Sequence, residues 1–415
     1  MNYGKMIYYH RKQKGWSQAQ LCQDICSVTH LSKIENGSKE VHFDLIEELL
    51  QKLNVSIEFE EEKLEEIKII IEDIADSIQR KNYTLGKQLL KSLEKYSTYL
   101  KYTEYVFLFE LTKTWFYIQT ENFKMADKLL EKLGKFKKKF SQYERCLYYF
   151  IIALYRFHQN SIYEAWDYLE KISECNDLQI FNEKLTEYYF YKALISAQLK
   201  RNGLSIHYSY KALSVFEKQH NFKRILDTEI LLAIELIKTG ELKRSESLLH
   251  SVYKNATLFK DKFIQKSALH NLGYLYFQKN EFEIANEYYF KALKLVGKDS
   301  CSYLSLITNI IQNLIFLGDL LEAKELSGAT LKEITNEESS DYIKINCLYL
   351  ESCENEIEYM TYLDKVVIPR MILDNNFKKI IEYKEKLAKY LIKHGNFEEA
   401  TIHLLDCNKL MKQSR

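Results

Sequence analysis

A fixed spacing of small and large side chains constrains this chain more than any other feature of its sequence. In residues 266–299, Gly273 stands at position eight and Ala285 at position twenty, counted from the first residue. Bulky residues surround them, among them Leu272 and Tyr289. Small residues let two antiparallel helices approach closely where they cross, and large neighbours fill the space around the crossing. The segment is therefore predicted to form one helical hairpin.

The same spacing recurs along most of the chain. Its repeats begin, about 40 residues apart, at Ile67, Phe107, Cys146, Thr186, Leu226, Lys266, Leu304, Ile343 and Ile381. Alanine fills position twenty or position eight at Ala126, Ala153, Ala165, Ala193, Ala233, Ala285, Ala323, Ala388 and Ala400. The repeat beginning at Ile343 fits worst, because Tyr362 stands where a small residue is expected. This is the tetratricopeptide (TPR) pattern, and it predicts that residues 67–415 form a right-handed superhelix of about nine helical hairpins.

Composition agrees with an all-α chain. One proline among 415 residues is what long helices require, because proline disrupts a helix interior. The net charge of +1 gives no global preference for nucleic acid, and no apolar run is long enough to span a membrane. Eight irregularly spaced cysteines are typical of reduced thiols in a cytosol, and we expect Cys22 and Cys26 to lie in a core rather than to bind zinc. No metal or other cofactor is expected.

The first 56 residues are predicted to be a separate small domain. Four helices are expected at residues 4–16, 17–26, 28–37 and 43–53, with Ser17 and Ser27 as N-caps. Residues 57–66 then form an acidic linker helix, in which six glutamates accompany one lysine. That helix is the fifth of the N-terminal part, and it is either a solvated spacer or a relay into the superhelix.

The segment RKQKGWSQAQLCQDICSVTHLSKIENGSKE resembles the Xre/lambda-repressor type of helix-turn-helix. One departure is Cys26, which stands where many members have glycine in the turn. The resemblance implies that the third helix enters the major groove of DNA. It implies contacts to bases or to the backbone for Gln18, Ser27, Thr29, His30, Lys33, Arg11, Lys12 and Lys39. The alternative for Lys33 and Arg11 is an ordinary solvated charge, and for His30 a surface position without a base contact.

The first helix of each TPR hairpin lines the concave face of the superhelix, chiefly through positions two, five, six, nine, twelve and thirteen. Asn271 and Asn309 both occupy position six, and a carboxamide can bridge the main chain of an extended peptide. The wider candidate set for peptide contact is His270, Tyr274, Gln278, Gln312, Asn313, Arg156, Glu187, Gln198 and Asp227. Alternatively, the two asparagines bridge neighbouring helices internally.

The combination of such a DNA reader with about nine TPR-like repeats resembles the peptide-pheromone-sensing RRNPP regulators of Gram-positive bacteria. The repeat number and the LCQDICSVTHLSKIENG segment are most similar to the NprR type. The resemblance implies a cytoplasmic, dimeric transcription regulator of quorum sensing and sporulation that binds double-stranded DNA at a pseudo-palindromic operator. A short signalling peptide in the groove would alter its oligomer or domain arrangement.

Protein sequestration and catalysis are the two alternative classes of function. The chain could be a protein-binding inhibitor that sequesters a phosphorelay or response-regulator partner, with DNA binding secondary. An enzymatic role is not expected, because the sequence contains no nucleophile–base pair, phosphate-binding loop, dinucleotide-binding glycine pattern or metal-ligand spacing.

Overall fold

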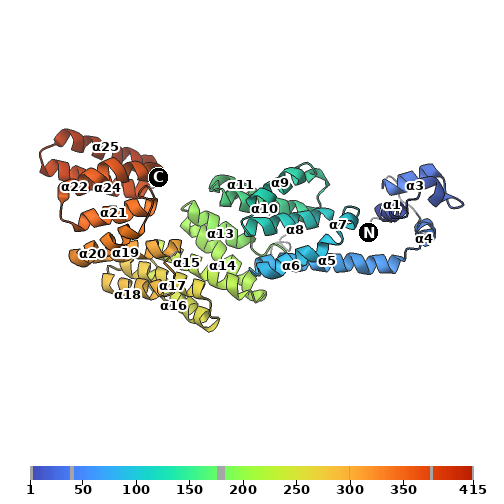
Figure 1. Ribbon diagram of the computed structural model, residues 1–415, viewed down its shortest axis with the longest axis horizontal. Coiled ribbons are helices and arrows are strands. Elements are labelled where there is room, and N and C mark those ends of the chain that lie inside the picture. The colour runs from blue at the N-terminus through green and yellow to red at the C-terminus, as the bar shows by residue number, and fades with distance from the viewer. Residues whose placement is uncertain (1–2, 38–41, 175–182, 299, 374–376, 414–415) are drawn as a thin grey trace. The chain divides into compact units, whose positions relative to one another are not determined.

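The computed structural model describes residues 3–37, 42–174, 183–298, 300–373 and 377–413. Every regular element among these residues is a helix, as Figure 1 shows. The chain forms two compact units, residues 1–235 and 236–415, whose boundary lies within helix α15 (Phe222–Lys238). The all-α prediction is confirmed. Within the described residues, no helix combines the length and apolar character needed to cross a bilayer.

The N-terminal unit begins with the predicted small helical domain. Its helices are α1 (Tyr3–Gln13), α2 (Gln18–Cys22), α3 (Val28–Glu35) and α4 (Phe43–Lys52). Both predicted caps are present: the Ser17 hydroxyl accepts a hydrogen bond from the Gln20 backbone N–H, and the Ser27 hydroxyl from that of His30. Apolar residues from all four helices, including Ile7, Leu21, Leu31 and Leu49, form a closed core.

Helix α5 (Ile57–Gln79) does not end where the linker was predicted to end. The acidic segment 57–66 and the first helix of the first repeat are one continuous helix. Its buried stripe includes Leu64, Ile67 and Ile71, so the apolar spacing passes through the predicted boundary without a break. The glutamates of the segment lie on the opposite, exposed face, with the exception of the buried Glu60.

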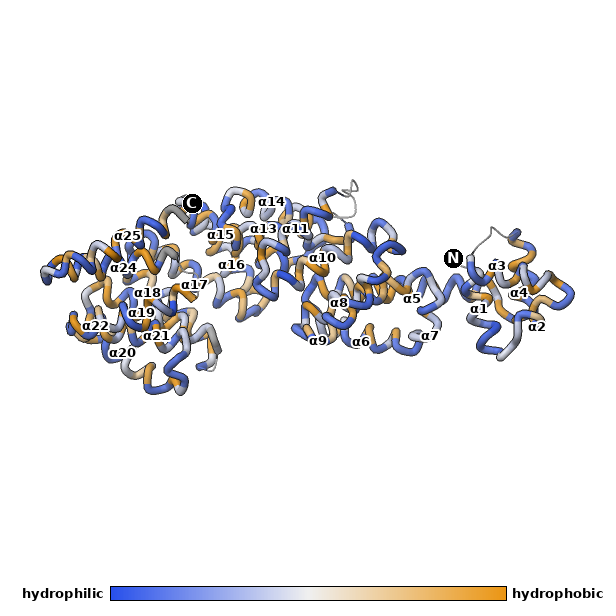
Figure 2. The backbone as a smooth tube through the Cα atoms, turned by 90° about the horizontal axis from the view of Figure 1, so that it is seen from above, coloured by the Kyte–Doolittle hydropathy of each residue, from blue (hydrophilic) through white to orange (hydrophobic). Residues whose placement is uncertain are grey.

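Within the part of the chain that the structure describes, nine successive pairs of helices follow the predicted repeats. In the N-terminal unit α5 is followed by α6 (Tyr83–Glu94), α7 (Ser97–Leu100), α8 (Val106–Gln119), α9 (Phe123–Gly134), η1 (Lys137–Lys139), α10 (Gln142–His158), α11 (Ile162–Ser173), α13 (Tyr188–Gln198) and α14 (Asn202–Lys218). After α15, the C-terminal unit contains α16 (Leu242–Leu258), α17 (Lys262–Gln278), α18 (Phe282–Leu293), α19 (Cys301–Leu317), α20 (Leu320–Glu333), α21 (Ser340–Ser352), α22 (Glu356–Tyr362), η2 (Leu363–Val367), α23 (Ile368–Leu373), α24 (Phe377–Lys393) and α25 (Phe397–Gln413). Figure 2 shows apolar and polar residues alternating along these helices, as stacked hairpins require.

The weakest predicted repeat is also the least regular in the structure. Beyond α22 the backbone passes through the π-helical turn η2 and into α23 without a break. Tyr362, the large residue at the position where a small one was expected, is the last residue before this turn. A π-helical turn is a local adjustment of the helix, and here it coincides with the departure from the small-residue pattern.

The small residues lie where the hairpins need them. All nine alanines of the repeat pattern are buried, with exposures between 0% and 2%. A Cβ added to Gly273 on α17 would come within 2.5 Å of the Tyr289 ring on α18, so only glycine permits this crossing. Gly86 on α6 is similar, because its added Cβ would lie 2.8 Å from the Phe116 ring.

Gly273→Ala is therefore expected to destabilise the C-terminal unit by about 1–3 kcal/mol, the usual cost of overpacking a core. The Tyr289 side chain is 2% exposed and has little room to move aside. Gly203→Ala on α14 is the matched control, because its added Cβ meets nothing within 4 Å. Urea unfolding should show a lower midpoint for the first variant alone, and equal midpoints would contradict the crossing argument.

Candidate functional site

The third helix of the small domain presents a short polar face to solvent. Thr29 and Lys33 on α3 are exposed, Ser27 caps the helix from an exposed position, and His30 is half-buried. Leu31 and Ile34 on the opposite side are buried in the domain core. The structure thus leaves the predicted base-reading residues available on one helix.

Arg11 is buried inside the small domain and is not placed to contact the DNA backbone. Its guanidinium is 3% exposed, and it donates to both carboxylate oxygens of Glu35 at 2.6 and 2.8 Å and to the Trp16 carbonyl at 2.8 Å. The hydrogen bond to Glu35 raises the pKa of Arg11. Gln18 also donates to Glu35, at 2.8 Å. Arg11 therefore joins α1 to α3 inside the domain.

Of the two lysines predicted to contact the DNA backbone, Lys12 lies within the described residues. Lys12 is exposed, with its ammonium 5.8 Å from the centre of the Tyr8 ring. Lys39 lies outside the described residues.

In the C-terminal unit the structure brings part of the predicted peptide set together. The Asn309 amide nitrogen on α19 lies 3.2 Å from the His270 Nε2 on α17. Burial, assisted by the Lys266 ammonium, lowers the pKa of His270. The imidazole is therefore neutral near pH 7, and its unprotonated nitrogen can accept the amide hydrogen.

Other asparagines of this unit serve their own helices first. The Asn271 amide donates to the Ser267 carbonyl, one turn back on α17, at 2.8 Å. Asn313 on α19 is 1% exposed, and its amide donates to the Asn286 side chain on α18 at 2.8 Å. The Asn271 contact therefore stays within α17, whereas the Asn313 contact bridges two neighbouring helices. Tyr274 is half-buried and Gln278 is exposed.

Gln312 lines a cavity of about 330 Å³ between α19, α21 and α24. Apolar side chains, including Phe316 and Leu348, form part of its wall. Lys386 on α24 forms a close ion pair with Glu351 on α21 and donates to the Tyr359 hydroxyl at 3.1 Å. The cavity therefore offers an apolar surface next to a fixed charged network.

The predicted residues of the N-terminal unit do not form one site. Glu187 is fully buried in a close ion pair with Arg224, whose guanidinium also lies 3.4 Å from Asp227. Asp227 is 2.5 Å from the Lys81 ammonium. This charge cluster joins three segments of the unit and is a structural feature. Arg156 pairs with Glu164 on α11, and Gln198 is exposed.

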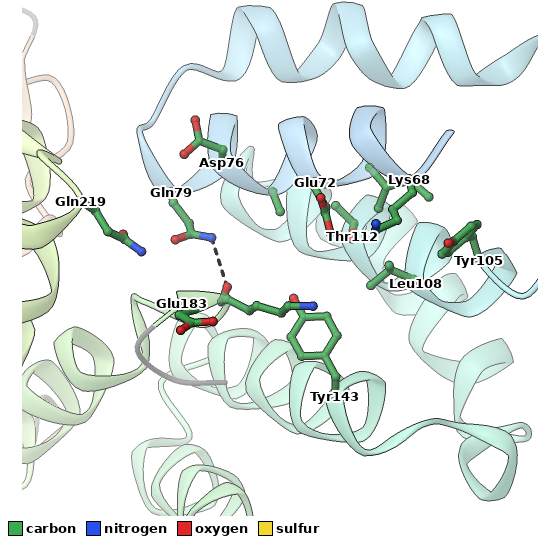
Figure 3. Close-up of a pocket in the computed structure, with 13 residues that line it drawn as sticks. Lys68, Glu72, Asp76, Gln79, Tyr105, Leu108, Thr112, Tyr143, Glu183 and Gln219 are labelled. Atoms are coloured by element: carbon green, nitrogen blue, oxygen red, sulfur yellow. Dashed lines mark hydrogen bonds between the residues drawn. The ribbon is translucent and has the colours of Figure 1, made fainter. Parts of the chain in front are cut away.

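A larger cavity, of about 420 Å³, lies in the N-terminal unit between α5, α8 and the start of α10. Figure 3 shows Lys68, Glu72 and Thr112 on one wall, with Tyr143 facing them. At its end, the Gln79 amide donates to the Lys184 carbonyl at 3.3 Å. Burial raises the pKa of Tyr143, so its phenol remains protonated at physiological pH.

Apart from Gln312, the residues of both cavities were missed, although the repeat pattern contains the signal that finds them. Lys68 and Thr112 occupy positions two and six of their repeats, and Lys386 and Glu351 occupy positions six and nine. These are the concave positions of the pattern. The predicted set was built around Asn271 and Asn309 and did not include them, whereas the concave positions alone select them.

Comparisons with known proteins agree with this architecture. Residues 7–59 match the helix-turn-helix family model. The transcriptional activator NprA of Geobacillus stearothermophilus is 23% identical over 92% of this chain and 96% of its own, and the regulatory protein RapD of Bacillus subtilis is 22% identical over 69% and 81%.

Two solved structures have the same fold. The apo form of the quorum sensor NprR from B. thuringiensis superposes with a TM-score of 0.74 at 22% identity, covering 84% of this chain and 99% of that one. NprR in complex with its cognate peptide NprX superposes with a TM-score of 0.63 at 23% identity, covering 84% and 98%. The chain is thus similar in fold to the NprR quorum sensor, and its N-terminus matches the helix-turn-helix that the sequence pattern predicts.

Proposed function

We propose that this protein is a transcription regulator that reads DNA with residues 1–56 and binds a short peptide on the concave face of residues 67–415. The observation that carries the proposal is the exposed polar face of α3 in the same chain as TPR-like helices whose concave positions line two cavities. The relatives support it, since one is named a transcriptional activator and another was solved with a peptide. As a DNA reader it acts in the bacterial cytoplasm, and the proposal assigns it no catalytic activity.

The proposed DNA contacts are Thr29, His30 and Lys33 on α3, and the further contacts proposed are Ser27, Gln18, Lys12 and Lys39. Arg11 is assigned to the support of α1 and α3 instead, because its guanidinium is held by Glu35. A homodimer would place two such helices in successive major grooves of a pseudo-palindromic operator.

The proposed peptide contacts begin with Asn309, His270, Gln312 and Tyr274. Asn271 and Asn313 support them from within the helices, and Gln278 extends the same unit. The peptide would control DNA binding only to the extent that it prefers one of two arrangements of the readers.

A second candidate function is sequestration of a phosphorelay protein by the TPR-like surface. The similarity to RapD over 69% of this chain favours keeping it. A pull-down of response regulators by the purified chain, with and without operator DNA, separates the two candidates.

Salt dependence tests the DNA interface. Lys33→Ala and Lys12→Ala should each weaken operator binding and reduce the slope of log affinity against log salt by about 1, because each removes one positive charge from the DNA interface. Lys254→Ala, an exposed lysine on α16, is the control and should change neither quantity. Fluorescence anisotropy between low and moderate salt measures both, and unchanged slopes in both variants would refute the interface.

Arg11→Met should destabilise the small domain by about 3–5 kcal/mol, because Glu35 would remain as a buried, unpaired carboxylate. Lys12→Met, which changes the adjacent exposed cation, is the control and should have little effect. The double variant Arg11→Met/Glu35→Leu should recover most of the loss, since no buried charge then remains. Urea unfolding monitored by circular dichroism measures all three, and equal stability of the two single variants would contradict the assignment.

Asn309→Ala should lower peptide affinity by about tenfold, the effect of roughly 1.4 kcal/mol of lost hydrogen bonding. Calorimetry measures this affinity with synthetic peptides of about five to ten residues, taken from short reading frames beside the gene. Such a peptide can present its main chain to the carboxamide. Asn408→Ala, on the exposed face of α25, is the matched control. The double variant Asn271→Ala/Asn309→Ala with unchanged affinity would exclude this pocket.

A further inference from the structure

A buried carboxylate joins the small helical domain to the first repeat. Glu60, on the first turn of α5, is only 2% exposed although its neighbours Glu61 and Glu62 are exposed. The Tyr99 hydroxyl on α7 donates to its carboxylate at 2.5 Å. His10 of α1 approaches the same oxygen with its Nε2 at 3.3 Å. One carboxylate therefore contacts α1 from one side and α7 from the other.

Aromatic rings extend this contact. The Tyr9 ring of α1 packs edge-on against Tyr99, with ring centres 5.1 Å apart, and lies 5.6 Å from Tyr102. Tyr8 lies 5.5 Å from Tyr102. The Lys63 ammonium is 3.8 Å from the centre of the Tyr99 ring, on the face of α5 that also holds Glu60. The outward side of α1 is thus covered by the base of the superhelix.

The charge at Glu60 depends on these partners. Burial alone would raise the pKa of the Glu60 carboxyl, but the contacts from His10 and Tyr99, with Lys63 nearby, hold it below its usual value. A buried carboxylate is costly unless several groups satisfy it. Separation of α1 from α7 would take His10 away from Glu60 and the Tyr8 and Tyr9 rings away from Tyr99 and Tyr102, whereas Tyr99 and Lys63 would stay beside the carboxylate.

The position of this contact determines what it does. The small domain is joined covalently to α5 only through the segment 53–56 between α4 and α5. A single short connection leaves rotation about it free. A second attachment through α1, at Glu60, removes that freedom and fixes the direction in which α3 faces.

We propose that Glu60 is a positioning residue that sets the half-site spacing the protein accepts, by fixing the small domain to the first repeat through α1. The proposal rests on the proposed DNA-binding function. A dimer whose readers are held rigidly tolerates one distance between half-sites, about one helical turn or a multiple of it. A dimer whose readers swivel accepts many distances.

The test compares Glu60→Gln with Glu61→Gln in the full chain. Both remove one negative charge from the same turn of α5, but only the first removes it from the buried contact. Tyr99→Phe is the second variant, since it keeps the ring and removes the hydroxyl that donates to Glu60. The DNA probes carry two copies of a half-site selected from random duplexes by the unaltered chain, at spacings varied one base pair at a time.

The unaltered chain and Glu61→Gln should show one sharp optimum, with affinity falling by at least about tenfold half a turn away. Glu60→Gln and Tyr99→Phe should flatten that profile to within about threefold while affinity for a single half-site stays unchanged. Superimposable profiles for Glu60→Gln and Glu61→Gln would overturn the proposal.

Hydrogen exchange provides a readout that needs no DNA. Amides at the end of α1 and in residues 97–103 should exchange faster by about tenfold in Glu60→Gln than in Glu61→Gln, because local opening exposes both surfaces. If the unaltered chain binds no DNA, the proposed function is refuted. Hydrogen exchange in Glu60→Gln and Glu61→Gln would still decide whether Glu60 holds the small domain to the first repeat. Equal exchange in both variants would refute the contact itself. If Glu60→Gln unfolds the small domain, Tyr99→Phe decides both measurements.

Discussion

Close approach of two helices at a small residue is the contact on which the whole architecture depends. No hairpin of a TPR-like stack encloses a core of its own, so each one is stable only while its apolar face lies against its neighbours. The distance between those faces is set at the crossing, where Gly273 meets the Tyr289 ring and buried alanines fill the equivalent places in other repeats. A side chain one methyl group larger would push the two helices apart there, and close packing would pass the displacement to the next hairpin.

Buried charged groups form specific contacts between helices of the chain. Arg11 with Glu35, Glu60 with Tyr99 and Arg224 with Glu187 each link elements that are far apart in the sequence. Such pairs add little net stability, because removing charges from water offsets most of their attraction. They select one packing arrangement over others, because an alternative packing leaves a buried charge without its partner and is strongly disfavoured. Apolar burial therefore holds the helices together, while the charged pairs determine which surfaces meet.

The repeat pattern predicts the fold closely because it is a local, periodic property of the chain. The buried alanines and even the irregular repeat around Tyr362 follow from it, whereas the helix-turn-helix was predicted from a separate motif. The prediction of a separate linker helix was wrong, because it relied on charge composition. Glutamates on an exposed face do not interrupt a helix whose apolar stripe continues from Leu64 to Ile67. The role of Arg11 could not be predicted either, since its partner Glu35 is 24 residues away and only the folded domain brings them together.

Candidate ligand contacts show the difference between residue type and residue position. Asparagine suits a peptide backbone chemically, but the same carboxamide equally suits the free carbonyls and side chains of its own stack, and Asn271 and Asn313 are used in that way. Position is more informative, because the curvature of stacked hairpins turns the same helix positions toward the concave face in every repeat. Both cavities are lined at those positions by residues as different as Lys68, Thr112 and Glu351. In a repeat protein the fold therefore determines where a ligand can lie, and the residues that vary at those positions determine which ligand it is.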